Sequence, residues 1–143
     1  MNLNKLTIKS QEAIANAQMI AMNNQQTQID NLHILKSMLE IDENVIPFLL
    51  KKQGVTPPVI LQVVDRQIKS IPKVQGGDVY LSGTAQSALQ KAILYCNEMG
   101  DEFVSLEHLF YGIFMANDAT SQILKDAGVT EKGIKAAITE LRK

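Results

Sequence analysis

Residues Phe103 to Phe114 read FVSLEHLFYGIF, and residues Ile29 to Leu39 read IDNLHILKSML. Both stretches begin with a β-branched or aromatic residue, pass an oxygen-bearing side chain, and then place a histidine before a run of bulky apolar residues. When His33 is set on His108, a shift of 75 residues, further positions coincide. The coinciding pairs are Gln11 with Gln86, Ala13 with Ala88, Ile14 with Leu89, Ala17 with Ala92, Ile29 with Val104, Leu35 with Phe110 and Leu39 with Phe114.

A second block repeats further along the chain. LKKQGVT, from Leu50 to Thr56, matches LKDAGVT, from Leu124 to Thr130, at a shift of 74 residues. A single deletion between the two blocks explains the change of shift. Matches that keep their order over most of the chain indicate a tandem duplication.

The duplication predicts one domain, residues 1–143, made of two similar halves. Repeat one covers about 3–69 and repeat two covers about 84–142. The segment between them, about 70–83, contains Pro72 and a pair of glycines and has no helical period, so we expect it to join the halves.

The apolar residues of each half recur at helical spacing, and this pattern predicts four helices in each half. Asp30 and Ser105 are suited to cap the second helix of each half, and Gly54 and Gly128 are suited to end the third. Pro57 stands where the first turn of the fourth helix needs no backbone N–H. The predicted fold is therefore all-α, with about eight helices in two four-helix units related by a pseudo-two-fold, and almost no β-structure.

The composition is that of an ordinary folded domain, with 45% apolar and 20% charged residues. The 14 basic and 15 acidic residues give a net charge of −1, which provides no basic stripe for nucleic acid. Cys96, the single cysteine, falls on an apolar helical stripe and is expected to be buried. No uncharged run reaches the ~18 residues of a membrane span, and the first residues lack the apolar core of a signal peptide. We therefore predict a cytoplasmic protein with no membrane partner.

The order of these phrases resembles the Clp N-terminal domain, the double-repeat helical module of Clp-type AAA+ unfoldases and disaggregases. The resemblance extends from Leu3 to Arg142. It rests on LTIKSQEAIANAQMIA, IDNLHIL, VSLEHLF, LLKKQGV, ILKDAGV and IPKVQGGDV. The opening MNLNKLT and the PKVQGGDV joint are more similar to the ClpB disaggregase type than to the ClpA and ClpC partners of proteases.

The resemblance implies a domain that recognises unfolded or aggregated polypeptide and delivers it to an AAA+ ring. The alternative is an adaptor-docking or phosphoarginine-docking domain of a ClpA-type or ClpC-type unfoldase. The sequence has no GxxxxGK[ST] phosphate loop, so we expect no ATP hydrolysis and no cofactor in this chain. ATP would bind to AAA+ domains of a longer parent protein, which the resemblance implies is a homo-hexamer that works with another chaperone system. The isolated domain is expected to be a monomer.

The resemblance also implies that Thr7, Asp101 and Glu107 matter for processing aggregates. Each has a structural explanation too. Thr7 suits the N-cap of the first helix, Asp101 lies in a turn, and Glu107 lies in a first helical turn, where the helix dipole favours a carboxylate.

Unfolded clients share exposed apolar side chains and backbone rather than a sequence, so we expect a shallow apolar groove with a few carboxylates. Leu94, Tyr95 and Met99 on the first helix of repeat two are the candidates for its apolar wall. Their alternative place is the core. Binding should be weak, with a micromolar or poorer dissociation constant, which corresponds to a binding free energy of only about 8 kcal/mol.

Three other kinds of site have less support. Resemblance to ClpC-type domains would imply a phosphoarginine site at each repeat with a Glu just before the motif histidine; repeat two has Glu107 there, but repeat one has Leu32. A zinc site needs three or four ligands, and neither His33 nor His108 has a suitable partner at i+3 or i+4, so both are expected to be helix-start histidines. An acid–base pair of Asp101 and Glu107 needs a shielded cleft, and no nucleophile–base arrangement is evident beside it.

Overall fold

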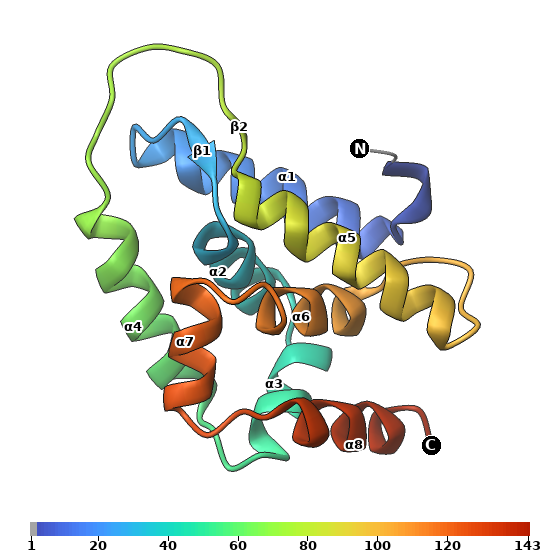
Figure 1. The fold of residues 1–143 in the computed structure, drawn as a ribbon. Helices are drawn as coiled ribbons and strands as arrows, with labels where there is room; N and C mark the ends of the chain where they lie inside the picture. The colour runs from blue at the N-terminus through green and yellow to red at the C-terminus, as the bar shows by residue number, and fades with distance from the viewer. Residues whose placement is uncertain (1–2) are drawn as a thin grey trace.

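The computed structural model describes residues 3–143, and over this range it contains eight α-helices (Figure 1). They are α1 (Ile8–Asn23), α2 (Asn31–Ile41), α3 (Val45–Lys51), α4 (Pro57–Ser70), α5 (Gly83–Glu98), α6 (Leu106–Phe114), α7 (Ala119–Asp126) and α8 (Glu131–Leu141). A 3-10 turn, η1 (Leu3–Lys5), precedes α1, and two strands of two residues each, β1 (Gln28–Ile29) and β2 (Tyr80–Leu81), pair in parallel. The predicted all-α fold of about eight helices is confirmed.

The helix ends follow the capping residues that the sequence offers. Asp30 and Ser105 are the N-caps of α2 and α6. Gly54 and Gly128 follow α3 and α7 with φ of 74° and 106°, the left-handed region that glycine adopts without strain. Pro57 is the first residue of α4. The expected joint is slightly shorter than 70–83, since Ser70 and Gly83 belong to the helices on either side.

The duplication is visible in backbone contacts as well as in sequence. Thr7 donates its backbone N–H to Val104 O at 3.0 Å, and Ser82 donates to Ile29 O at 3.0 Å. Both the donors and the acceptors of these two hydrogen bonds are 75 residues apart. The start of the first helix in each half is thus fastened to the segment before the second helix of the other half.

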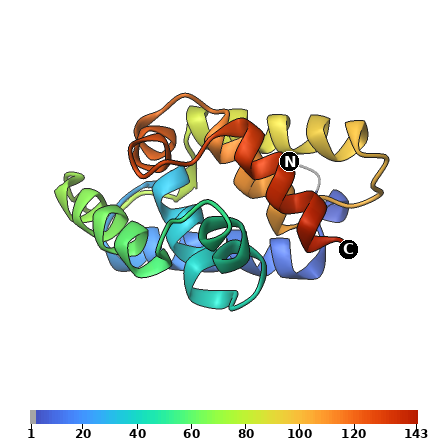
Figure 2. The same ribbon diagram turned by 90° about the horizontal axis from the view of Figure 1, so that it is seen from below.

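The later helices of each half contact both halves. Within each half α1 packs on α2 and α5 on α6, and α4 packs on α2 and α7 on α6, while across the halves α3 packs against α8 and α4 against α7. Figure 2 shows α1–α4 along the lower side of the molecule and α5–α8 along the upper side, facing each other. Over residues 3–143, each half thus supplies helices that pack against the other.

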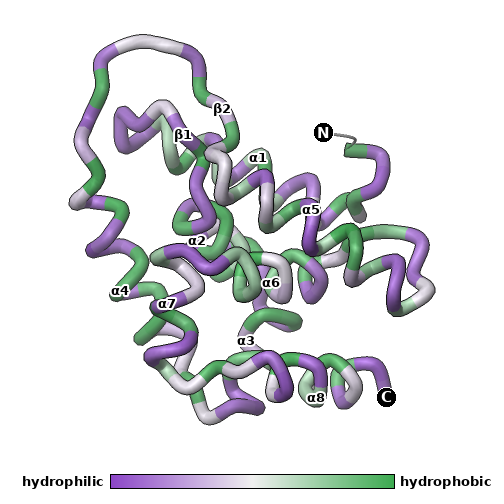
Figure 3. Tube along the Cα trace, in the orientation of Figure 1, coloured by the Kyte–Doolittle hydropathy of each residue, from purple (hydrophilic) through white to green (hydrophobic). Residues whose placement is uncertain are grey.

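The core lies around α2 and α6. All nine residues of α6 are buried, and the largest fully buried side chains include Leu35 and Met38 on α2 and Phe110 on α6. The outer helices are amphipathic, and Figure 3 shows hydrophobic and hydrophilic residues alternating along α8. Cys96 is buried, as predicted, and burial raises the pKa of its thiol. Within residues 3–143 no helix combines the length and the hydropathy that crossing a membrane requires.

Candidate functional site

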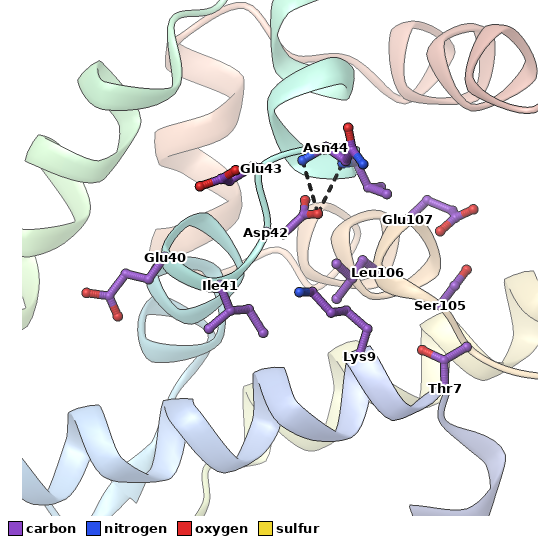
Figure 4. A pocket seen from close by; sticks show the side chains of 11 residues that line it. Thr7, Lys9, Glu40, Ile41, Asp42, Glu43, Asn44, Ser105, Leu106 and Glu107 are labelled. Atoms are coloured by element: carbon purple, nitrogen blue, oxygen red, sulfur yellow. Dashed lines mark hydrogen bonds between the residues drawn. The ribbon is translucent and has the colours of Figure 1, made fainter.

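An open groove of about 550 Å³ lies between the two halves, and we call it the inter-repeat groove (Figure 4). Three segments form its walls: the start of α1, the loop from the end of α2 into α3, and the start of α6. Its lining residues are Thr7, Lys9, Glu40, Ile41, Asp42, Glu43, Asn44, Val45, Ser105, Leu106 and Glu107. The first two walls belong to repeat one and the third belongs to repeat two, so neither half could form the groove alone.

The groove combines apolar surface with carboxylates. Ile41, Val45 and Leu106 supply the apolar part. Four lining residues are acidic and one, Lys9, is basic. Asp42 is already engaged, because its carboxylate caps α3 by accepting backbone N–H groups at 2.7 to 3.2 Å. The remaining carboxylates give the groove a negative character that suits backbone N–H groups and basic side chains.

Two of the predicted residues, Thr7 and Glu107, lie together in this groove. The Thr7 hydroxyl accepts the Ser10 backbone N–H at 3.1 Å, which is the helix cap expected from the sequence. Glu107 is only 8% exposed, and its Oε2 accepts from Arg142 Nη2 at 3.1 Å and Nε at 3.3 Å. Burial alone raises the pKa of Glu107, but hydrogen bonds from Ser105, its own backbone and Arg142 outweigh burial and hold it below its usual value.

Asp101 does not line the groove but is joined to it through Arg142. Its Oδ2 lies 2.8 Å from Arg142 Nη2 and 2.8 Å from His108 Nε2. The hydrogen bond from Arg142, more than that from His108, keeps the pKa of Asp101 below its ordinary value. One guanidinium therefore links two of the three residues that the resemblance singled out.

Both motif histidines are fixed by the start of their helix. The backbone N–H of Asp30 donates to His33 Nδ1 at 2.8 Å, and that of Ser105 donates to His108 Nδ1 at 2.9 Å. Since Nδ1 accepts, the proton lies on Nε2, which donates to Gln26 Oε1 at 2.6 Å in the first case and to Asp101 in the second. Burial lowers the pKa of both histidines, so both are neutral parts of the fold.

The structure also aligns a serine, a histidine and a carboxylate, which the sequence reasoning did not anticipate. Ser105 Oγ lies 3.0 Å from His108 Nδ1, and Asp101 binds the opposite ring nitrogen. A general base needs a free lone pair beside the hydroxyl, but the backbone N–H of Ser105 already occupies Nδ1. The arrangement therefore caps α6. Within residues 3–143, no three His, Cys, Asp or Glu side chains are grouped to hold a metal ion.

The predicted apolar wall divides between surface and core. Leu94 is 61% exposed, whereas Tyr95 is 7% exposed and its ring stacks on Tyr111 with centroids 3.9 Å apart. Leu94 and Tyr95 line a small depression of about 130 Å³ beside α6. Met99, at the C-cap of α5, is half-buried against the core and lines neither this depression nor the inter-repeat groove.

The 75-residue shift relates the groove to a second region, where the start of α5 meets the start of α2. In that region side-chain hydrogen bonds connect the facing segments. Asp30 Oδ1 accepts from Ser82 Oγ and from Thr84 Oγ1, both at 3.0 Å. Asn31 Nδ2 donates to Asp118 Oδ2 at 2.8 Å. In the groove itself Thr7, Lys9, Ser105 and Leu106 stand at the positions of Ser82, Thr84, Asp30 and Asn31. Of these two equivalent regions, the inter-repeat groove is open, whereas hydrogen bonds hold the other one closed.

Sequence reasoning missed Arg142 and the loop between α2 and α3. A loop of ordinary polar residues carries no pattern that would place it opposite α6. Arg142 could have been found by comparing the repeats, because three charged residues of repeat two replace uncharged ones of repeat one. The charged residues are Asp101, Glu107 and Arg142, and their counterparts are Gln26, Leu32 and Ile68.

Comparison with known proteins shows the family to which this chain belongs. Residues 5–139 match the family model described as Clp repeat (R) N-terminal domain, so the chain belongs to that family, as predicted. Its sequence is 48% identical over 143 residues to the chaperone protein ClpB of Bacteroides thetaiotaomicron. That match covers all of this chain and 17% of that protein, so the chain spans about a sixth of the relative's length.

Two solved structures support the fold. The Hsp104 N-terminal domain from Candida albicans has a TM-score of 0.84 and 23% identity, covering 96% of this chain and 91% of that one. A ClpV N-domain, solved in complex with a VipB peptide, has a TM-score of 0.80 and 16% identity, covering 97% of this chain and 88% of that one.

Proposed function

We propose that this chain is the substrate-binding domain of a ClpB-type disaggregase. It recognises unfolded or aggregated polypeptide in the inter-repeat groove and delivers it to an AAA+ ring. The observation that carries the proposal is the groove itself, in which Thr7 and Glu107, from different halves, face the same apolar surface. In the region that the 75-residue shift relates to the groove, the hydrogen bond between Asn31 and Asp118 connects the facing segments instead.

The chemistry of the groove suits a client without fixed sequence. Ile41, Val45 and Leu106 can cover an apolar side chain, while the carboxylates can accept from the client's backbone N–H groups. Ile8, which follows Thr7 in the chain, is an apolar residue that is 76% exposed, although it does not line the groove. The ClpV N-domain, which shares this fold, was solved with a bound peptide, and this supports peptide binding as a use of the fold.

The remaining parts of the proposal concern the parent protein. Relatives such as the Bacteroides ClpB are about six times as long as this chain, which leaves room for AAA+ domains that bind ATP. We place the parent among homo-hexameric ATPases that cooperate with another chaperone system in the cytoplasm. The isolated domain would be a monomer that binds neither nucleic acid nor membrane.

Adaptor docking or phosphoarginine docking, as in a ClpA-type or ClpC-type unfoldase, is the competing function. A reader of phosphoarginine at both repeats would need a carboxylate at each motif. Repeat one has Leu32 at its motif, which is 4% exposed and belongs to the core, so one of the two carboxylates is missing. The geometry therefore favours the client-binding function.

The test is NMR shift mapping on the 143-residue chain. The probe is reduced, carboxamidomethylated α-lactalbumin, which is permanently unfolded, and the comparison is the folded, disulfide-intact form of the same protein. We expect micromolar binding of the unfolded form only, with shifts at the start of α1, the α2–α3 loop and the start of α6. Shifts elsewhere, or equal binding of the folded form, would contradict the proposal.

A matched pair of variants places the client. Ile41→Asp puts a charge on the apolar part of the groove, so we expect affinity to fall about tenfold through lost apolar contact. Val59→Asp makes the same kind of change at a 53% exposed residue of α4 that lies outside the groove, and it should bind as the wild type does.

A further inference from the structure

Arg142 brings three separate elements together beside the inter-repeat groove. It is the C-cap residue of α8, Asp101 lies in the turn between α5 and α6, and Glu107 is in the first turn of α6. Its Nη2 lies 2.8 Å from Asp101 Oδ2 and 3.1 Å from Glu107 Oε2, and its Nε lies 3.3 Å from the same Glu107 oxygen. Both donors meet the same Glu107 oxygen, so the contact fixes the position of Oε2.

At the equivalent position of repeat one, uncharged groups make the contacts that Asp101 and Arg142 make in repeat two. There Gln26 Oε1 accepts from the histidine of the motif, and Gln26 Nε2 donates to Ile68 O at 2.8 Å. Gln26 and Ile68 are the counterparts of Asp101 and Arg142. The neutral version satisfies the histidine and joins the end of α4 to the turn after α1. Holding the helices together therefore does not require the ionic version.

The charged cluster of repeat two also has an energetic cost, which arises from burying the Glu107 carboxylate. Glu107 is 8% exposed, and taking a carboxylate out of water is unfavourable unless a partner compensates. Its counterpart Leu32 fills the equivalent position with an apolar side chain and meets no such difficulty. A charged cluster that replaces an adequate neutral one, and does so at the wall of the open groove, points to a use other than stability.

We propose that Arg142 is a positioning residue for client binding, which holds the Glu107 carboxylate ionised and keeps its Oε2 in a fixed position at the groove wall. This inference rests on the proposed function and deepens it. One guanidinium facing two carboxylates, with His108 neutral, leaves the cluster with a net negative charge. The groove wall can therefore still attract the N–H groups and basic side chains of an unfolded client while Glu107 stays in place.

The test compares Arg142→Met with Arg142→Lys and with the control Lys132→Met, an exposed lysine of the same helix. Two quantities are measured on the 143-residue chain: the pKa of the Glu107 carboxyl by carbon-13 NMR titration, and affinity for reduced, carboxamidomethylated α-lactalbumin. For Arg142→Met we expect the pKa of Glu107 to rise and the affinity to fall about tenfold. Arg142→Lys keeps the charge, so it should restore most of the pKa and part of the affinity, and Lys132→Met should change neither.

Each outcome decides a separate point. An unchanged pKa of Glu107 in Arg142→Met would show that Arg142 does not hold that carboxylate. A raised pKa with wild-type affinity would show that the held carboxylate does not serve client binding. Either result overturns the inference, provided that the unfolding midpoint confirms the fold. If the wild type does not bind the probe, the proposed function fails and the client-binding role of Arg142 with it, while the NMR titration still reports on the contact with Glu107.

Discussion

The substitution Gly112→Ala tests how closely α5 and α6, the first two helices of repeat two, approach each other. Gly112 lies in the middle of α6, where it faces the backbone of α5. A Cβ added at Gly112 would overlap the carbonyl oxygen of Ala88 and lie 3.0 Å from the backbone nitrogen of Ala92. Since both obstacles are backbone atoms of a helix, no side-chain rotation can relieve the overlap, and the two helices must separate.

The size of the effect follows from two opposing contributions. An extra methyl in a tightly packed contact typically costs about 1–3 kcal/mol, and a backbone obstacle places Gly112→Ala at the upper end. Alanine is favoured over glycine within a helix by about 1 kcal/mol, which offsets part of that cost. The net expectation is a loss of about 2 kcal/mol in the free energy of unfolding. For a chain of this length that corresponds to a fall of roughly 4–8 °C in Tm.

The control is Gly83→Ala, which makes the same chemical change at the first residue of α5. A Cβ there meets nothing within 4 Å, and the residue has no positive φ. We expect Gly83→Ala to stabilise the protein by about 0.5 kcal/mol through the lower entropy of the unfolded chain. Urea unfolding followed by circular dichroism measures both variants. A Gly112→Ala protein as stable as Gly83→Ala would refute the close approach of α5 and α6.

Three further predictions concern buried polar groups. Burial lowers the pKa of His33 and His108 from 6.5, so the unfolded chain binds more protons, and stability that is fully present above about pH 6.5 should fall at lower pH. Urea midpoints at pH 7.5 and 5.5 check this, and equal midpoints would contradict it. Tyr111→Phe removes the hydrogen bond to Glu131 Oε2 at 2.8 Å and should lower the unfolding free energy by about 1 kcal/mol in the same assay, whereas wild-type stability would show that the bond contributes nothing. Ser37→Ala removes the bond from Ser37 Oγ to the α1 backbone at 2.6 Å and should also cost about 1 kcal/mol, an expectation that an unchanged midpoint would overturn.

Much of the fold could be predicted because its determinants are local. Helical spacing of apolar residues, the glycines at 54 and 128 and Pro57 fix where helices begin and end, and the repeated motif shows that they occur twice. The packing between the halves, with α3 against α8 and α4 against α7, could not be predicted. Periodicity shows which face of a helix is apolar, but a partner in the same half and one in the other half satisfy that face equally well.

The candidate site was predictable only in part, for a related reason. Thr7 and Glu107 were chosen through the family resemblance, and the structure places them together at one groove. Tyr95 was expected in the same surface, yet its stacking on Tyr111 buries nearly all of its ring. An aromatic residue on an amphipathic helix can face either side of the boundary between core and surface, and only the packing of the neighbouring helix decides.

Comparison of the two halves provides information that neither half contains alone. Where both repeats keep a residue type, as at His33 and His108, the structure shows the same capping role twice. Where repeat two replaces neutral residues by Asp101, Glu107 and Arg142, the new charges meet in one cluster beside the open groove. The shared histidines thus maintain the fold, whereas in this cluster the difference between the repeats falls at the groove wall, where Glu107 lies. Because residues of both halves line the groove, this difference can affect the groove only while the two halves remain packed together.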